Sequence, residues 1–237
     1  MVSALQQKKN LINHVLTLNF VAPSDKVPGY YYYNCSVCSN DYASVNGQVG
    51  AQIVPGTEIE GIDSIPFPRF NTFENINTGY QYSARGASLR INHQESADLQ
   101  DIRFTASMQV PAGAEIIQFG YVFSQQQFIT DKDNFIIGAE KVYDTQCSNY
   151  TVHSETGTDI YTFNLVIKNK FTNWDKTYVA RAYVTYTYDG RTFTVYDEDY
   201  SARSTAEVAR KIVESEFERT EVKEYIQAHI LDRLSAV

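Results

Sequence analysis

The residues around the Asp189-Gly190 pair restrict the possible folds of this chain more than any other stretch. Over residues 180–188, small and apolar side chains alternate with Arg, Tyr and Thr side chains, which is the period of two that a half-buried β-strand shows. Asp-Gly tolerates positive φ at both central positions of a type I′ turn, and the alternation resumes in the next six residues, RTFTVY. This stretch therefore predicts a β-hairpin, and with it a fold built on antiparallel strands.

The same alternation assigns the two faces of the first hairpin strand. Successive side chains of a strand point to opposite faces, so Ala182, Val184 and Tyr186 lie together on one face. Arg181 and Tyr183 lie on the other face. We expect the first set to face the core and the second set to face the outer surface.

Further strand patterns precede the hairpin, and turn residues separate them. They are GASLRIN, IRFTASMQV, IIQFGYVFS and YTFNLVIKN, in that order. Strands that do not alternate with helices favour antiparallel packing over a parallel sheet. The expected fold is therefore mainly β, with an antiparallel β-sandwich over residues 79–203 and a C-terminal amphipathic helix.

The two ends of the chain differ from this central part. Residues 1–78 mix Pro and Gly with short apolar pieces, which predicts an N-terminal arm and an irregular segment with one or two short strands. Ser204 or Thr205 can cap a helix, and Glu207 is placed to complete a capping box. Residues 204–237 then carry apolar side chains at helical spacing. Such a tail packs on the sheet or forms the seam of an oligomer, and we expect a homo-oligomer.

Composition narrows the range of partners. The formal net charge is -8 and the pI is near 5.0, which argues against nucleic acid because binding to phosphates needs many Lys and Arg contacts. No apolar run approaches the roughly 18 residues that a membrane-spanning helix needs. The first 20 residues lack the order of charged, apolar and small residues that a secretory signal shows.

Cys35 and Cys38 are separated by two residues, the spacing at which one turn presents two thiolates to zinc or forms a redox pair. No second CxxC follows, and Cys147 and the four His residues are scattered through the chain. A Zn²⁺ site at Cys35 and Cys38, a local disulfide and simple reduced thiols all remain open. Reduced thiols are the favoured interpretation, and we expect no cofactor.

Arginine side chains interrupt several strand patterns. Arg90, Arg103, Arg181 and Arg203, together with Tyr183, are candidates for a face that binds an anion or a glycan. The alternative is that these arginines form cross-strand ion pairs, with Glu115, Asp197 or Glu207 as partners.

The common motifs of enzyme active sites are absent: the chain contains no GxSxG, HExxH, GxxxxGK[ST] or GxGxxG. Loop carboxylates such as Asp131 and Asp197 could act as a pair in glycan hydrolysis. Acidic loop residues are more often simply solvated.

A resemblance adds to this interpretation. GASLRIN, DIRFTASM, IIQFGYVFS, YVARAYVTY and SARSTAEVAR resemble, in that order, a β-rich domain of unassigned activity from large surface and secreted proteins of Gram-positive bacteria. The likeness covers about residues 79–213, and the upstream YYYNCSVCSN is similar to spacer segments of such proteins. The resemblance implies a non-catalytic module displayed at a surface.

The residue patterns and the resemblance together indicate a class of function. We expect a structural or adhesive module on the extracellular face of a virion or a cell wall. A bacteriophage accessory or decoration protein, which lysis releases, would reconcile a surface module with the lack of an export signal. Its partners would be protein subunits of an assembly or a bacterial surface glycan. The alternative is a secreted or wall-associated glycan-processing enzyme that uses loop carboxylates.

Overall fold

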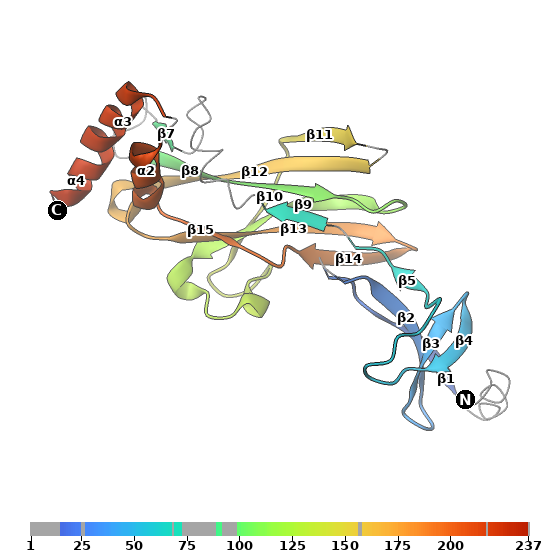
Figure 1. Ribbon diagram of the computed structural model, residues 1–237. Coiled ribbons are helices and arrows are strands. Elements are labelled where there is room, and N and C mark those ends of the chain that lie inside the picture. The colour runs from blue at the N-terminus through green and yellow to red at the C-terminus, as the bar shows by residue number, and fades with distance from the viewer. Residues whose placement is uncertain are drawn as a thin grey trace.

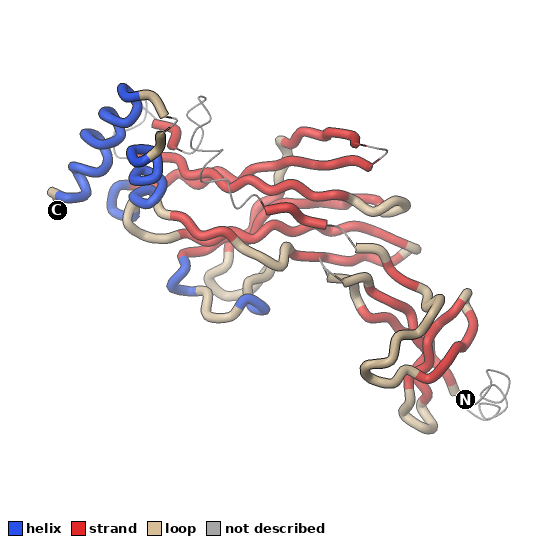
Figure 2. Tube along the Cα trace, in the orientation of Figure 1, coloured by secondary structure: helices blue, strands red, loops and turns tan. Residues whose placement is uncertain are grey.

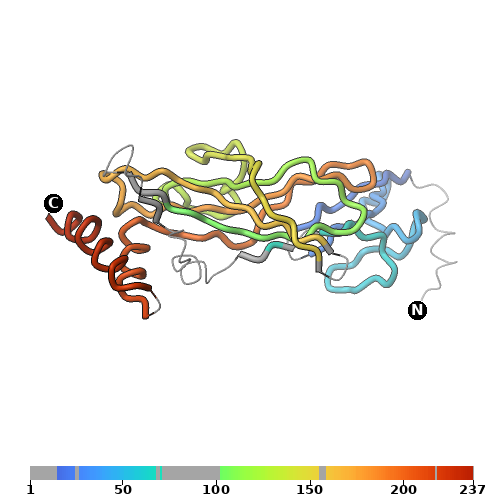
Figure 3. The backbone as a smooth tube through the Cα atoms, turned by 90° about the horizontal axis from the view of Figure 1, so that it is seen from above, coloured from blue at the N-terminus to red at the C-terminus, as the bar shows by residue number. Residues whose placement is uncertain are grey.

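The computed structural model describes residues 15–24, 27–67, 69–72, 89–91, 99–155, 158–216 and 218–236. These residues form an elongated molecule whose centre is an antiparallel β-sandwich (Figure 1). A small accessory sheet lies at one end of the sandwich and helices lie at the other end (Figure 2). The view from above shows the same sequence of parts along the long axis (Figure 3). The predicted class, mainly β with antiparallel strands and a C-terminal helix, is confirmed.

Within the described residues, two sheets make up the sandwich. The first, called the β13 sheet, has the order β10-β9-β13-β14, and β15 also pairs with β13. The second, called the β12 sheet, has the order β11-β12-β8-β6, and β7 also pairs with β8. The strands of the β13 sheet are β9 (Glu115–Gln125), β10 (Tyr143–Gln146), β13 (Tyr178–Tyr188), β14 (Arg191–Tyr196) and β15 (Ser201–Arg203). Those of the β12 sheet are β6 (Arg69–Thr72), β7 (Leu89–Ile91), β8 (Leu99–Gln109), β11 (Tyr150–Glu155) and β12 (Thr158–Lys170).

The hairpin predicted from the sequence joins β13 to β14. Asp189 and Gly190 have φ values of 50° and 68°, as a type I′ turn requires, and Tyr188 pairs with Arg191 directly beside the turn. Local turn chemistry is therefore enough to set this register.

The main core fills the space between the two sheets. Ala182, Val184 and Tyr186 are buried in it, which confirms the predicted inner face of β13. They pack with apolar residues of β8 and β12, and the Tyr121 hydroxyl of β9 donates a hydrogen bond across the core to the Phe163 carbonyl at 3.2 Å.

The outer face of β13 is covered, which corrects part of the prediction. Arg181 and Tyr183 do point away from the main core, but they are 8% and 0% exposed. Residues 126–142, which connect β9 to β10, fold over this face and include the short 3₁₀ helices η2 (Gln126–Phe128) and η3 (Lys132–Asn134). Phe135 from this connection forms a second apolar cluster with Tyr183. An apolar contact from a distant segment thus buries a face that alternation alone assigned to solvent.

The accessory sheet occupies residues where the sequence predicted an arm and an irregular segment. It consists of β1 (Leu16–Val21), β2 (Gly29–Cys35), β3 (Asp41–Val45), β4 (Gln48–Gln52) and β5 (Ser64–Ile65). Asn46 and Gly47, with φ of 52° and 70°, form the turn between β3 and β4. Asn-Gly is a strong hairpin signal. The strands β2 and β3 are rich in Tyr and small residues rather than in regularly spaced aliphatic ones. The alternation of apolar and polar side chains that predicts a strand is therefore weak in this part of the sequence.

The hairpin turn of β13 and β14 contacts the accessory sheet. The Tyr31 hydroxyl donates to the Asp189 carboxylate at 3.2 Å, and the Phe20 ring lies edge-on to Phe193 at 5.6 Å. The Arg191 guanidinium lies 4.9 Å from the centroid of the Phe20 ring. A mixture of aromatic and polar contacts therefore holds the accessory sheet against the sandwich.

The helices close the opposite end. Helix α2 (Thr205–Glu214) begins as predicted, because the Ser204 hydroxyl accepts a hydrogen bond from the Glu207 amide at 3.0 Å. It is followed by α3 (Thr220–Ile226), a π-helical turn η5 (Gln227–Leu231) and α4 (Asp232–Ser235). Ile226 and Ile230 belong to the main core cluster, so the tail packs on the sandwich. In α4, the Arg233 guanidinium lies 5.3 Å from the centroid of the Trp174 ring. Trp174 is buried and directly follows the 3₁₀ turn η4 (Phe171–Asn173). No helix in the described part of the chain is long and apolar enough to cross a membrane.

Candidate functional site

Arg181 holds loops together beneath the surface of the β13 sheet. Its Nε donates to the Asp197 carbonyl, and its Nη1 donates to the Lys132 and Phe135 carbonyls at 3.1 and 3.3 Å. The guanidinium also lies 5.2 Å from the centroid of the Tyr196 ring. This arginine therefore connects the 126–142 segment to the loop that follows β14, and its donors are directed at backbone carbonyls rather than at solvent.

The other members of the predicted Arg and Tyr set do not join Arg181 in one exposed face. Tyr183 is fully buried, and burial raises the pKa of its hydroxyl to about 12. Arg203 is buried, with its guanidinium 5.1 Å from the centroid of the Phe104 ring. Arg103 is half-buried, beside Val166 on the outer face of the β12 sheet. Arg90 pairs through its backbone in β7, and its side chain lies outside the described part of the structure.

The candidate carboxylates have local structural roles. The Asp131 side chain accepts a hydrogen bond from the Asp133 amide at 2.9 Å, at the start of η3. The Asp197 side chain is buried and accepts from the Asp199 amide at 3.1 Å. Each acid thus stabilises its own turn, as Asp commonly does. Among the described residues, no group of three or more His, Cys, Asp or Glu side chains could hold a metal ion.

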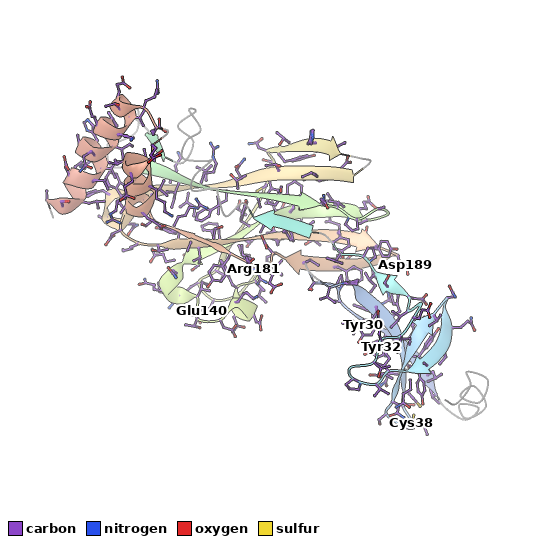
Figure 4. The ribbon with its side chains drawn as sticks, viewed as in Figure 1. Tyr30, Tyr32, Cys38, Glu140, Arg181 and Asp189 are labelled. Carbon is purple, nitrogen blue, oxygen red and sulfur yellow. The ribbon has the colours of Figure 1, made fainter. Side chains whose placement is uncertain are left out.

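A concave surface lies where the 126–142 segment leaves β9 and returns at β10. One hollow of about 460 Å³ is lined by Phe123, Ser124, Gln125, Phe128, Lys141, Tyr143 and Tyr178. A second hollow of about 520 Å³ continues along the segment and shares Phe128 and Lys141 with the first. We call this continuous surface the η2 groove. Figure 4 shows Glu140, which lines the second hollow, on the segment below the sandwich.

Aromatic rings dominate the first hollow of the η2 groove. Tyr143 is 65% exposed, and its ring lies 5.7 Å from that of Phe123 at an interplanar angle of 31°. Phe128 is also exposed, and the Lys141 ammonium lies 4.8 Å from the centroid of its ring. Exposed aromatic surface at a concave site, next to a cation, is typical of binding sites rather than of ordinary loop surface.

The backbone under these rings is firmly held. The buried Ser124 hydroxyl donates to the Lys141 carbonyl at 2.8 Å, and Lys141 itself has a φ of 60°. Tyr143 pairs with Phe123 in the ladder of β10 and β9. The Phe123 and Tyr143 rings are therefore presented from a strand pair, which limits the conformational entropy that a ligand would have to remove there. Phe128 lies in η2.

Amide and charged groups surround the rings. Gln125 lines the first hollow, while Gln127, Asp131 and Asn134 line the second. Flat apolar rings beside several hydrogen-bonding groups suit a ligand that has both apolar faces and many hydroxyls. A glycan has this character. Of these residues only Asp131 could be singled out from the sequence, because neither Phe128 nor Tyr143 belongs to a recognisable motif.

The cysteines lie in separate places. Cys35 is buried at the end of β2, and Cys38 is partly exposed in the turn between β2 and β3. Figure 4 shows Cys38 at the tip of the accessory sheet, far from Arg181 and Glu140. Cys147 follows β10, where burial raises the pKa of its thiol to about 11. No disulfide joins these three residues.

The chain matches no protein-family model, and a comparison with the curated proteins finds no relative.

Proposed function

We propose that this chain is a non-catalytic adhesive or structural module that binds a bacterial surface glycan through the η2 groove. The observation that supports the proposal is the pair of exposed rings, Phe128 and Tyr143, at the concave edge of a rigid β-sandwich. The resemblance described above supports display at a surface, on a cell wall or on a virion. Protein subunits of an assembly would use other faces of the elongated molecule.

Binding, rather than catalysis, is what the groove is suited for. Glycan hydrolysis requires a pair of carboxyl groups that flank the bond to be cleaved. The two carboxylates of the η2 groove, Asp131 and Glu140, both line the second hollow. Asp131 accepts a hydrogen bond from the Asp133 amide and so stabilises its own turn, whereas the exposed rings line the first hollow. The first hollow therefore offers stacking surface and hydrogen bonds, and no carboxylate of the described residues lines it.

The test measures binding of the purified chain to isolated Gram-positive cell walls and to soluble wall polysaccharides. Tyr143→Ala and Phe128→Ala should each weaken binding about fivefold to tenfold, because loss of an aromatic stacking contact costs about 1–1.4 kcal/mol. Tyr150→Ala is the matched control, since Tyr150 is also exposed but lies on β11 of the other sheet.

Two results would contradict the proposal. Equal binding by the wild type and by the Tyr143 and Phe128 variants would exclude the η2 groove as the site. Release of reducing sugars by the wild-type chain, with loss of that activity in Asp131→Asn or Asp197→Asn, would support the enzymatic alternative instead.

A further inference from the structure

The turn that contains Cys35 and Cys38 has a defined backbone geometry. The Ser39 amide donates to the Cys35 carbonyl at 2.9 Å, and the Cys35 amide donates to the Asn40 carbonyl at 3.0 Å. Ser39 has a φ of 58°, in the left-handed region that residues other than Gly, Asn and Asp rarely adopt. A tightly closed turn therefore carries both thiols, and its strained residue directly follows the second cysteine.

Backbone amides inside this turn are directed at sulfur. The amides of Val37 and Cys38 both donate to the Cys35 Sγ, each at 3.4 Å. Two backbone donors therefore converge on one sulfur at the start of the turn. They also fix the direction of the sulfur, as outer hydrogen bonds do for metal ligands in general.

The second thiol lies on the accessible side of the turn. Cys38 is partly exposed, and its Sγ lies 3.6 Å from the Tyr42 hydroxyl of β3. The Tyr42 hydroxyl is thus the polar group beside the Cys38 sulfur. Amides of the turn therefore hold the buried Cys35 sulfur, while Cys38, three residues later, is partly exposed.

We propose that Cys35 and Cys38 bind a thiophilic d¹⁰ metal ion, Zn²⁺ or Cu⁺, through their two thiolates. Each thiol releases its proton on binding, so the ion exchanges for two protons. Thiolates select these ions over Mg²⁺ or Ca²⁺, which prefer oxygen ligands. Two thiolates are enough for Cu⁺, whereas Zn²⁺ normally takes four ligands and would add water or groups from a second molecule.

The binding test uses the reduced full chain and the metal ion alone. We expect one equivalent of Zn²⁺ or Cu⁺ per chain in competition with a chromophoric chelator for each ion. Co²⁺ added in place of Zn²⁺ should give a thiolate-to-metal charge-transfer band in the near ultraviolet. Cys38→Ser should reduce the affinity at least a hundredfold.

Cys147→Ser is the matched control, because it removes the cysteine that lies outside the turn, and it should bind as the wild type does. Cys38→Ser is preferred over a change at the buried Cys35, and circular dichroism checks that it folds. If the reduced chain binds neither ion, or if Cys38→Ser retains full affinity, the proposal is wrong. If air oxidation forms a Cys35–Cys38 disulfide and the reduced chain takes up no metal, the pair is a redox pair instead.

Discussion

Replacing Tyr183 by phenylalanine should stabilise the protein. The Tyr183 hydroxyl is fully buried and has no hydrogen-bond partner among the described residues. A buried polar group without a partner costs about 1–3 kcal/mol. Tyr183→Phe removes only this oxygen and keeps the ring in the apolar cluster with Phe135. We therefore expect the free energy of unfolding to rise by about 1 kcal/mol. For a chain of 237 residues, this raises Tm by about 2–4 °C.

Tyr186 provides a matched control on the opposite face of the same strand. It is equally buried, but its hydroxyl donates to the Pro66 carbonyl at 2.8 Å. Tyr186→Phe should therefore lower the free energy of unfolding by about 1 kcal/mol. The two tyrosine-to-phenylalanine changes, three positions apart, are expected to have opposite signs.

Urea unfolding followed by the fluorescence of Trp174, the only tryptophan in the chain, measures both effects. A shift of the midpoint at constant m reports a change in stability. If Tyr183→Phe destabilises the protein by as much as Tyr186→Phe, the Tyr183 hydroxyl has a partner, and the reasoning is refuted.

The same pair predicts a response to alkaline pH. Burial raises the pKa of both Tyr183 and Tyr186 to about 12, against about 10 in an unfolded chain. The unfolded state thus loses the proton first, so stability is complete below pH about 10 and falls as pH rises toward 12. In each phenylalanine variant, the free energy of unfolding should fall less than in the wild type between pH about 10 and about 12.

Three further changes test other parts of the structure by urea or thermal unfolding. Gly120→Ala should cost about 1–3 kcal/mol and weaken glycan binding, because its Cβ would collide with the Thr145 carbonyl and displace β10; unchanged stability would contradict this. The Asp63 carboxylate accepts from Ser44 and from backbone amides of the β3–β4 turn, and these bonds lower its pKa. Its stabilisation is present above pH about 4 and is lost below it, so Asp63→Asn should remove part of the acid sensitivity of the accessory sheet. Ser204→Ala should cost about 1 kcal/mol through loss of the helix cap, with a value near zero excluding that role.

Short-range patterns explain which features could be predicted from the sequence. The Asp189-Gly190 turn, the inner face of β13 and the Ser204 cap each depend on residues within a few positions of one another. Such features follow from turn chemistry and from side-chain alternation, which tertiary contacts here reinforce. Asn46-Gly47 is a turn signal of the same kind, and it marks the β3–β4 hairpin.

Long-range contacts explain what could not be predicted. Nothing near Arg181 or Tyr183 indicates that Phe135, more than 40 positions earlier in the chain, covers them. The η2 groove has the same origin, since Phe128 and Tyr143 come together only when the 126–142 segment folds back. A face that alternation exposes can be buried by any apolar connection long enough to reach it.

The way short strands share the edges of the sandwich has a consequence for solubility. β14 pairs with Tyr183–Tyr188 of β13, and β15 pairs with Tyr178–Ala180. Two short strands therefore divide this edge of β13 between them. β6 and β7 divide the edge beside β8 in the same way. A divided edge offers no continuous row of amides and carbonyls on which another chain could template a strand. β10 and β11 are undivided strands at the ends of their sheets. β11 is the longer of the two and exposes Tyr150 and Val152, so we expect edge-to-edge aggregation to begin there.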